Sequence, residues 1–193
     1  MTYRLRTDAN GSRCRRADLK FKQNKKIQNS KGIAVPLNTK KVMGRRFVRY
    51  ESFDELLADA ERLATIPTRT LGNWSVGQIY KHLAKASDVM IDGAPMAAPV
   101  PIQWILSLFL KKRMLASTLS PGFRLPKKAA ALLPNSTSTE DGLELLRVAT
   151  ARIKQTDRRA PLHPAFGKCS ADEWNAWHLR HSEMHMSFII PEV

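Results

Sequence analysis

The 193-residue sequence predicts an all-α fold: a four-helix bundle with a proline-rich insertion, containing a short extra helix, between its second and third helices. Four segments begin with Ser or Thr followed three residues later by Glu or Gln, a pattern that satisfies two otherwise free backbone N–H groups at a helix start. Apolar residues at helical spacing follow each start, and no segment shows the alternation of a strand. Four amphipathic helices bury their apolar faces by packing against one another.

The first two helices are expected from about residue 53 to 65 and from about 76 to 91. Their start signals are Ser52 with Glu55 and Ser75 with Gln78. The side chains expected to face the core are Leu56, Leu57, Ala60, Leu63, Ile79, His82, Leu83, Ala86 and Met90. His82 is thus predicted to point into the bundle.

The last two helices are expected from about residue 139 to 155 and from about 171 to 189. Their start signals are Thr137 with Glu140 and Ser170 with Glu173. The side chains expected on their inner faces are Leu143, Leu146, Val148, Ala149, Ile153, Trp174, His178, His181, His185 and Phe188. The inner face of the last helix therefore carries three histidines.

The insertion between the second and third helices, residues 94–136, contains one apolar run at 102–110, followed by the basic Lys111–Arg113. The run is too short to span a bilayer, which needs about 20 residues. We expect a short helix that covers the core. A lid over the end of the bundle and an interfacial membrane anchor are the two alternatives.

The net charge of +15 is concentrated at the amino terminus. Residues 1–46 hold 14 Lys and Arg against 2 Asp, which gives +12, and residues 47–193 hold 18 against 15, which gives +3. We expect residues 1–42 to be a basic, disordered extension and residues 43–193 to be the helical domain. The extension could bind nucleic acid weakly through its charge, whereas the nearly neutral domain shows no nucleic-acid-binding motif.

The two cysteines, Cys14 and Cys169, are too few for a disulfide framework, and the amino terminus has no apolar run of the length that a secretory signal needs. A reducing, cytoplasmic environment fits this composition best.

His181 and His185 are the most informative residues of the chain. Four residues advance a helix by about 6 Å, so two imidazoles at this spacing can converge on one metal ion. His82, on another helix, could complete a three-histidine site in the core. His178 lies on the same stripe, but it is about 10 Å along the axis from His185, so the two cannot share one ion. Geometry alone leaves open whether His178 or His185 pairs with His181.

Three stretches together resemble a known family. They are Asn73-Trp-Ser-Val-Gly-Gln-Ile-Tyr-Lys-His82-Leu-Ala, His163-Pro-Ala-Phe-Gly-Lys and Trp174-x-x-x-His178-Leu-Arg-His181-x-Glu-x-His185. About residues 46–191 are similar to the DinB-like superfamily of four-helix metalloproteins, in a bacterial branch designated only as a domain of unknown function.

The resemblance implies that His82, His181 and His185 bind a divalent metal ion, zinc or nickel. It also implies thiol-dependent transferase activity that uses a low-molecular-weight thiol on a small-molecule substrate. Many DinB-like transferases have Arg-Gly-Gln after the last ligand, where this chain has Met186-Ser-Phe188. Metal-assisted hydrolysis therefore stays open, as do a metal-free small-molecule-binding or interaction protein and a homodimer.

Three further residues are candidates for contact with a ligand or substrate: Gln78, His178 and His163. Gln78 lies one turn before His82 and is also expected to cap its helix. His178 could instead be a packed core residue, and His163, before Pro164, is expected to fix a turn. The tryptophans are expected in the core first and as pocket walls second. Glu183 faces away from His181, which suits a surface or interhelical charge partner better than a ligand.

Overall fold

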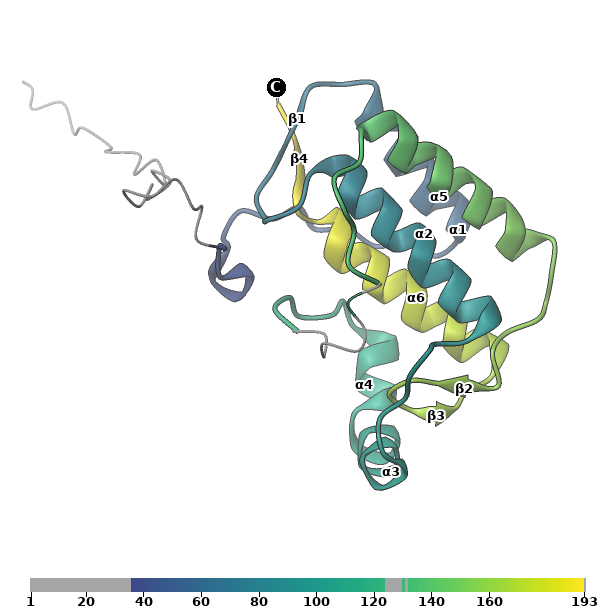
Figure 1. Ribbon diagram of the computed structural model, residues 1–193. Helices are drawn as coiled ribbons and strands as arrows, with labels where there is room; N and C mark the ends of the chain where they lie inside the picture. Colours follow the sequence, from purple (N-terminus) through teal and green to yellow (C-terminus); the bar gives the residue numbers. More distant parts are fainter. Residues whose placement is uncertain (1–35, 124–129, 131, 193) are drawn as a thin grey trace, which may run out of the picture. The chain divides into compact units, whose positions relative to one another are not determined.

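The computed structural model describes residues 36–123, 130 and 132–192, and this part of the chain is mostly helical (Figure 1). The α-helices are α1 Phe53–Ala64, α2 Val76–Asp92, α3 Val100–Phe109, α4 Lys111–Ala116, α5 Thr139–Lys154 and α6 Ala171–Met186. A short 3-10 helix, η1, covers Thr39–Lys41. Two antiparallel two-stranded sheets pair β1 Thr68–Thr70 with β4 Ile189–Pro191, and β2 Leu162–His163 with β3 Gly167–Lys168.

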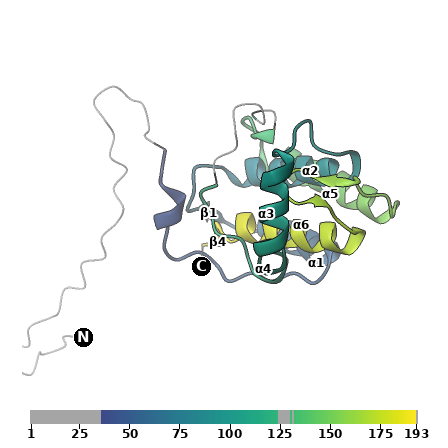
Figure 2. The same cartoon turned by 90° about the horizontal axis from the view of Figure 1, so that it is seen from below.

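The four long helices contact one another in the cyclic order α1, α5, α2 and α6. Figures 1 and 2 show them side by side, with α3 and α4 outside the group. All four correspond to predicted helices. They pack together because each is amphipathic and buries its apolar face against the others.

The strands correct the prediction that the chain is entirely helical. Each has only two or three residues, which is too short to produce a recognisable alternation in the sequence. The last helix also ends at Met186 rather than near 189, because Ile189 and its neighbours pair with β1 instead. The sheet of β1 and β4 lies at the carboxyl end of α6, and the sheet of β2 and β3 lies at its amino end (Figure 1).

The predicted helix starts hold with two differences. Ser75 and Ser170 form complete reciprocal caps with Gln78 and Glu173. Ser52 accepts its expected hydrogen bond, but the Glu55 carboxylate binds the backbone N–H of Glu51 instead. Helix α5 begins at Thr139 as expected, but its cap is Ser138 rather than Thr137, since the Ser138 side chain accepts from the backbone N–H of Asp141.

The core contains the predicted apolar faces, with one clear exception. Val148 is 60% exposed. Helix α5 buries the stripe of Gly142, Leu143, Leu146, Ala149 and Ile153 against its neighbours, and Val148 lies on the other side of this stripe. Leu57 is only half-buried.

Residues 1–35 of the predicted extension lie outside the described residues. Its last part, from Pro36 on, contacts the helical domain: the Asn73 side chain accepts from the backbone N–H of Leu37 and donates to the carbonyl of the same residue. The expected domain limits stay a prediction.

Helices α2 and α5 lie too close together at two glycines to accommodate a Cβ atom. A Cβ atom on Gly77 would lie 2.0 Å from the backbone carbonyl oxygen of Ser138, and one on Gly142 would lie 2.4 Å from the carbonyl oxygen of Gly77. Both obstacles are backbone atoms, so no side-chain rotation can relieve the clash. The contact therefore requires glycine on both helices.

Gly77→Ala and Gly142→Ala should each lower the free energy of unfolding by about 1–3 kcal/mol or more, because the added methyl group must push the two helices apart. Denaturant unfolding of the purified variants measures the loss. Ala151→Ser also adds one heavy atom to α5, but at an exposed position, and should change stability by less than about 0.5 kcal/mol. Equal stabilities for all three variants would contradict the close contact.

The helix expected to cover the core does not do so. Gln103 is the single buried residue of α3, whereas Trp104, Leu108 and Phe109 are exposed. The basic Lys111–Arg113 belongs to a second short helix, α4, that was not expected. Among the described residues, no helix has both the length and the apolarity needed to cross a membrane.

Candidate metal centre

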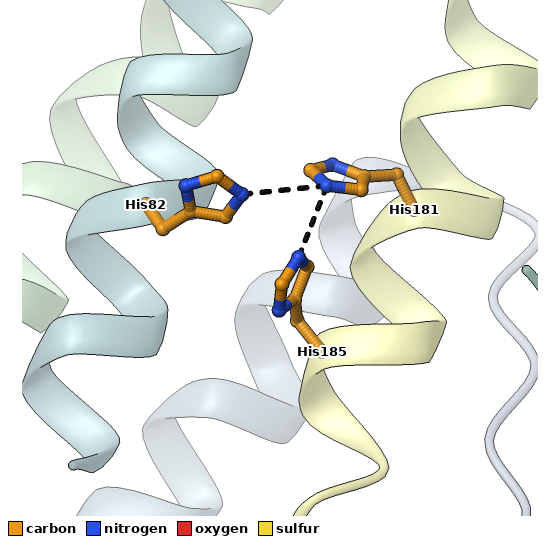
Figure 3. A group of neighbouring side chains, drawn as sticks. All are labelled: His82, His181 and His185. Carbon is orange, nitrogen blue, oxygen red and sulfur yellow. Dashed lines mark hydrogen bonds between the residues drawn. The ribbon is translucent and has the colours of Figure 1, made fainter. Parts of the chain in front are cut away.

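Three of the predicted site residues meet between two helices. His82 projects from the middle of α2, and His181 and His185 project from the last turns of α6 (Figure 3). Each histidine contributes one ring nitrogen, and these three nitrogens all lie within 4.8 Å of one another. His82 is buried, and the other two are partly exposed. The packing of α2 on α6 thus brings together residues separated by about a hundred positions in the chain.

The hydrogen bond of His82 determines which of its nitrogens faces the other two histidines. Its Nδ1 lies 3.0 Å from the carbonyl oxygen of Leu132, which can only accept, so Nδ1 carries the proton. Its Nε2 therefore presents a lone pair toward Nε2 of His181, 3.4 Å away. A backbone carbonyl that orients an imidazole through its far nitrogen is the usual support of a histidine ligand.

The spacing of the three nitrogens fits a metal ion. Nε2 of His181 lies 3.1 Å from Nε2 of His185 and 3.4 Å from that of His82. Two nitrogens bound at 2.0–2.1 Å to one tetrahedral ion are separated by about 3.3–3.4 Å. One proton on His181 cannot serve both neighbours with good geometry, so a single cation satisfies this arrangement better than hydrogen bonds do. The donor set suits zinc and other divalent transition metals.

Two tryptophans hold the imidazoles in place. The Trp74 ring stacks on His185 at a centroid distance of 5.2 Å and lies 4.9 Å from His82. Trp177, one turn before His181, stacks on that ring at 4.9 Å. Both tryptophans are only partly buried, so they act as walls of the histidine cluster as much as core residues. The expected core role is also present, since Trp74 and Trp177 pack against the hydrophobic core and Trp174 is fully buried in it.

Burial keeps the three imidazoles neutral at physiological pH. It lowers the pKa of His82, a shift that the hydrogen bond to Leu132 opposes only in part. Burial and the neighbouring His185 hold the pKa of His181 well below its usual range, and burial and His82 do the same for His185. Neutral imidazole is the form that binds metal ions.

His178 lies outside the cluster. Its ring centroid is 6.3 Å from that of His181, and its Nε2 lies 3.0 Å from Oγ of Ser87. The Ser87 hydroxyl donates to the Leu83 carbonyl, so it accepts from His178. The ring is fully buried against Phe53, and burial lowers its pKa to about 3. The structure thus favours the packed-core interpretation of His178.

His163 and Gln78 have local roles. Nδ1 of His163 accepts the backbone N–H groups of Ala165 and Phe166, which fixes the turn between β2 and β3 as expected. Gln78 completes the α2 cap, and its side-chain amide also donates to the carbonyl of Pro134, 3.4 Å away. Gln78 therefore supports the segment that holds His82, rather than the histidine cluster directly.

Glu183 is fully buried, contrary to the surface position considered from the sequence. Its carboxylate pairs with Arg180 at 2.8 Å and accepts the backbone N–H of Tyr50 and the hydroxyl of Thr118. This network ties α6 to the segments before α1 and after α4. Glu183 is thus an interior charge partner on the side of α6 opposite the histidines.

The fold and the cluster define a mostly helical protein with a three-histidine group that could hold a metal ion. Residues 43–192 match the model of the family described as protein of unknown function (DUF1569). The chain belongs to this family. Searches of curated proteins and of solved structures found no match.

The buried His163 should make the protein sensitive to acid. Burial lowers its pKa from 6.5 to about 3, so the unfolded chain binds a proton that the folded chain rejects between these two values. The contribution of the neutral His163 to the free energy of unfolding is therefore fully present above about pH 6.5 and is lost as the pH decreases toward 3. His163→Asn keeps an acceptor for the turn, and between pH 7 and 5 it should lose about 2 kcal/mol less unfolding free energy than the wild type.

Chemical denaturation at pH 7, 6 and 5 measures this difference. Leu162→Asn, at the exposed neighbouring position of β2, is the matched control and should keep the wild-type pH dependence. If the free energy of unfolding changed with pH equally in His163→Asn and in the wild type, His163 would not be held neutral by burial.

Proposed function

We propose that this protein is a divalent-metal-dependent enzyme of the DinB-like class, with His82, His181 and His185 as the metal ligands and zinc or nickel as the metal. The observation that carries the proposal is the convergence of three neutral imidazoles with N···N separations of 3.1 and 3.4 Å. The cyclic packing of four long helices, with one histidine from the second and an i, i+4 pair from the last, supports the DinB-like assignment.

The residues around the cluster suit a catalytic site better than a purely structural one. Three neutral imidazoles would leave a bound divalent ion its full charge, and such an ion would supply the Lewis acidity that lowers the pKa of a water or thiol. His181 and His185 are partly exposed, so we place the approach of a small molecule on that side of the cluster. A fourth histidine, cysteine or carboxylate does not join the three within the described residues.

The chain's own groups supply orientation and shielding. The Leu132 carbonyl fixes the His82 tautomer, so the Nε2 lone pair is available without a proton transfer. Trp74 and Trp177 stack on His185 and His181, which limits rotation of these rings and excludes water from two sides. We propose thiol-dependent transfer to a small-molecule substrate as the reaction, with a low-molecular-weight thiol as the second reactant. This choice of reaction comes from the DinB-like resemblance.

Metal binding by histidine variants tests the proposal. The wild type, prepared without a polyhistidine tag, should bind about one equivalent of Zn²⁺ or Ni²⁺, and His185→Ala should lose stoichiometric binding because one of three ligands is gone. His178→Ala is the matched control on the same helix. Because His178 bonds to Ser87 and not to a ligand, its removal should weaken binding by less than about tenfold.

Elemental analysis and titration calorimetry measure both quantities. Stoichiometric binding by His185→Ala with none by His178→Ala would reverse the ligand assignment. Equal retention by both variants, or no metal in the wild type, would instead favour a metal-free binding protein.

A further inference from the structure

Helix α3 carries its apolar side chains on the outside of the molecule. Trp104 is 75% exposed, Leu108 76% and Phe109 71%, and Val100 and Ile105 are also exposed. Exposed large apolar side chains that occur together on one helix, rather than scattered singly over the surface, can mark a site of protein or membrane interaction. A helix that is apolar on nearly all sides is stable only when something covers it.

The outward orientation of α3 is fixed by specific contacts of its polar atoms. The Gln103 side chain donates to the Ala98 carbonyl at 2.8 Å and packs against Gly167 of β3. The Ala98 N–H in turn donates to the carbonyl of Pro164, beside β2. At the other end, Lys111 pairs with Glu173 and donates to the Lys168 carbonyl. The helix is thus docked by its polar groups, which leaves its apolar face pointing away from the core.

The charge of the segment that carries this face has one sign. From Gly93 to Phe123 the sequence contains three basic residues, Lys111, Lys112 and Arg113, and no Asp or Glu. Lys112 and Arg113 are exposed, and neither has a carboxylate partner in the part of the chain that the structure describes. A surface that combines exposed Trp, Phe and Leu with unpaired cations is complementary to an anionic lipid surface.

We propose that α3, with the basic start of α4, docks the protein on an anionic membrane surface as an interfacial helix. Ten residues make a helix about 15 Å long, half the length needed to span a bilayer but sufficient to lie in its interface. Leu108 and Phe109 enter the boundary between headgroups and acyl chains, Trp104 lies at the headgroup level, and Lys112 and Arg113 meet lipid phosphates. This inference does not depend on the metal site.

A second copy of the chain is a less suitable partner for the same face. A two-fold symmetric contact places identical patches against each other, and here it would bring two segments with cations and no acidic residues together. An anionic surface neutralises those charges instead.

Vesicle binding by the full chain tests the proposal. The protein is sedimented with vesicles of phosphatidylcholine and phosphatidylglycerol, in low salt and in high salt, which screens adsorption by the basic residues 1–42. In high salt the wild type should remain partly bound, and Leu108→Glu should bind about tenfold or more weakly. Val148→Glu places the same charge at an exposed apolar position of α5 and should bind like the wild type.

A quenching measurement distinguishes insertion from adsorption. Lipids brominated on their acyl chains should quench the emission of Trp104, and Trp104→Phe should lose that quenching while still sedimenting with the vesicles. Melting temperatures of all variants should match that of the wild type, since the positions are exposed. The proposal fails if Leu108→Glu binds vesicles like Val148→Glu, or if light scattering shows a wild-type dimer that Leu108→Glu dissociates without any vesicle binding by the wild type.

Discussion

Three imidazole nitrogens that face one another form a group that could hold a metal ion between them. His82 presents a lone pair at Nε2, because its other nitrogen, Nδ1, carries the proton and donates it in a hydrogen bond to the Leu132 carbonyl, and Nε2 of His181 lies 3.4 Å away. The same His181 atom is 3.1 Å from Nε2 of His185. Neutral rings cannot satisfy both contacts with well-aligned hydrogen bonds, whereas one divalent ion can. The proposed metal binding therefore depends on the arrangement of these three nitrogens.

The rest of the fold holds α2 and α6 in the positions that bring the three histidines together. Helix α2 is held against α5 by the backbone contact between Gly77 and Gly142, and it presents His82 on the face that packs on α6. Helix α6 has histidines on one face and a buried ion pair on the opposite face. The histidines lie on one, and Arg180 with Glu183 binds the segment before α1 on the other. Structural charge pairing is therefore kept away from the histidine cluster.

Much of this could be predicted from the sequence, because helix caps and helical periodicity are local properties. Ser75 and Ser170 start their helices as expected, and the spacing of His181 and His185 allows their two imidazoles to converge on adjacent turns of a helix. The Leu132 carbonyl could not be predicted, since every residue has one and its role depends on tertiary packing. The orientation of α3 was also missed. A segment that is apolar on nearly all sides has no period that identifies its buried face, so its exposure becomes apparent only from the docking of Gln103.

X-ray absorption at the metal edge of the zinc- or nickel-loaded protein tests the three-histidine site. We expect three imidazole nitrogens at about 2.0–2.1 Å around a zinc ion, and one sulfur in place of an oxygen or nitrogen neighbour when a low-molecular-weight thiol is added. Nitrogen scattering from fewer than three imidazoles, or sulfur ligation before any thiol is added, would contradict the assignment of His82, His181 and His185 as the site.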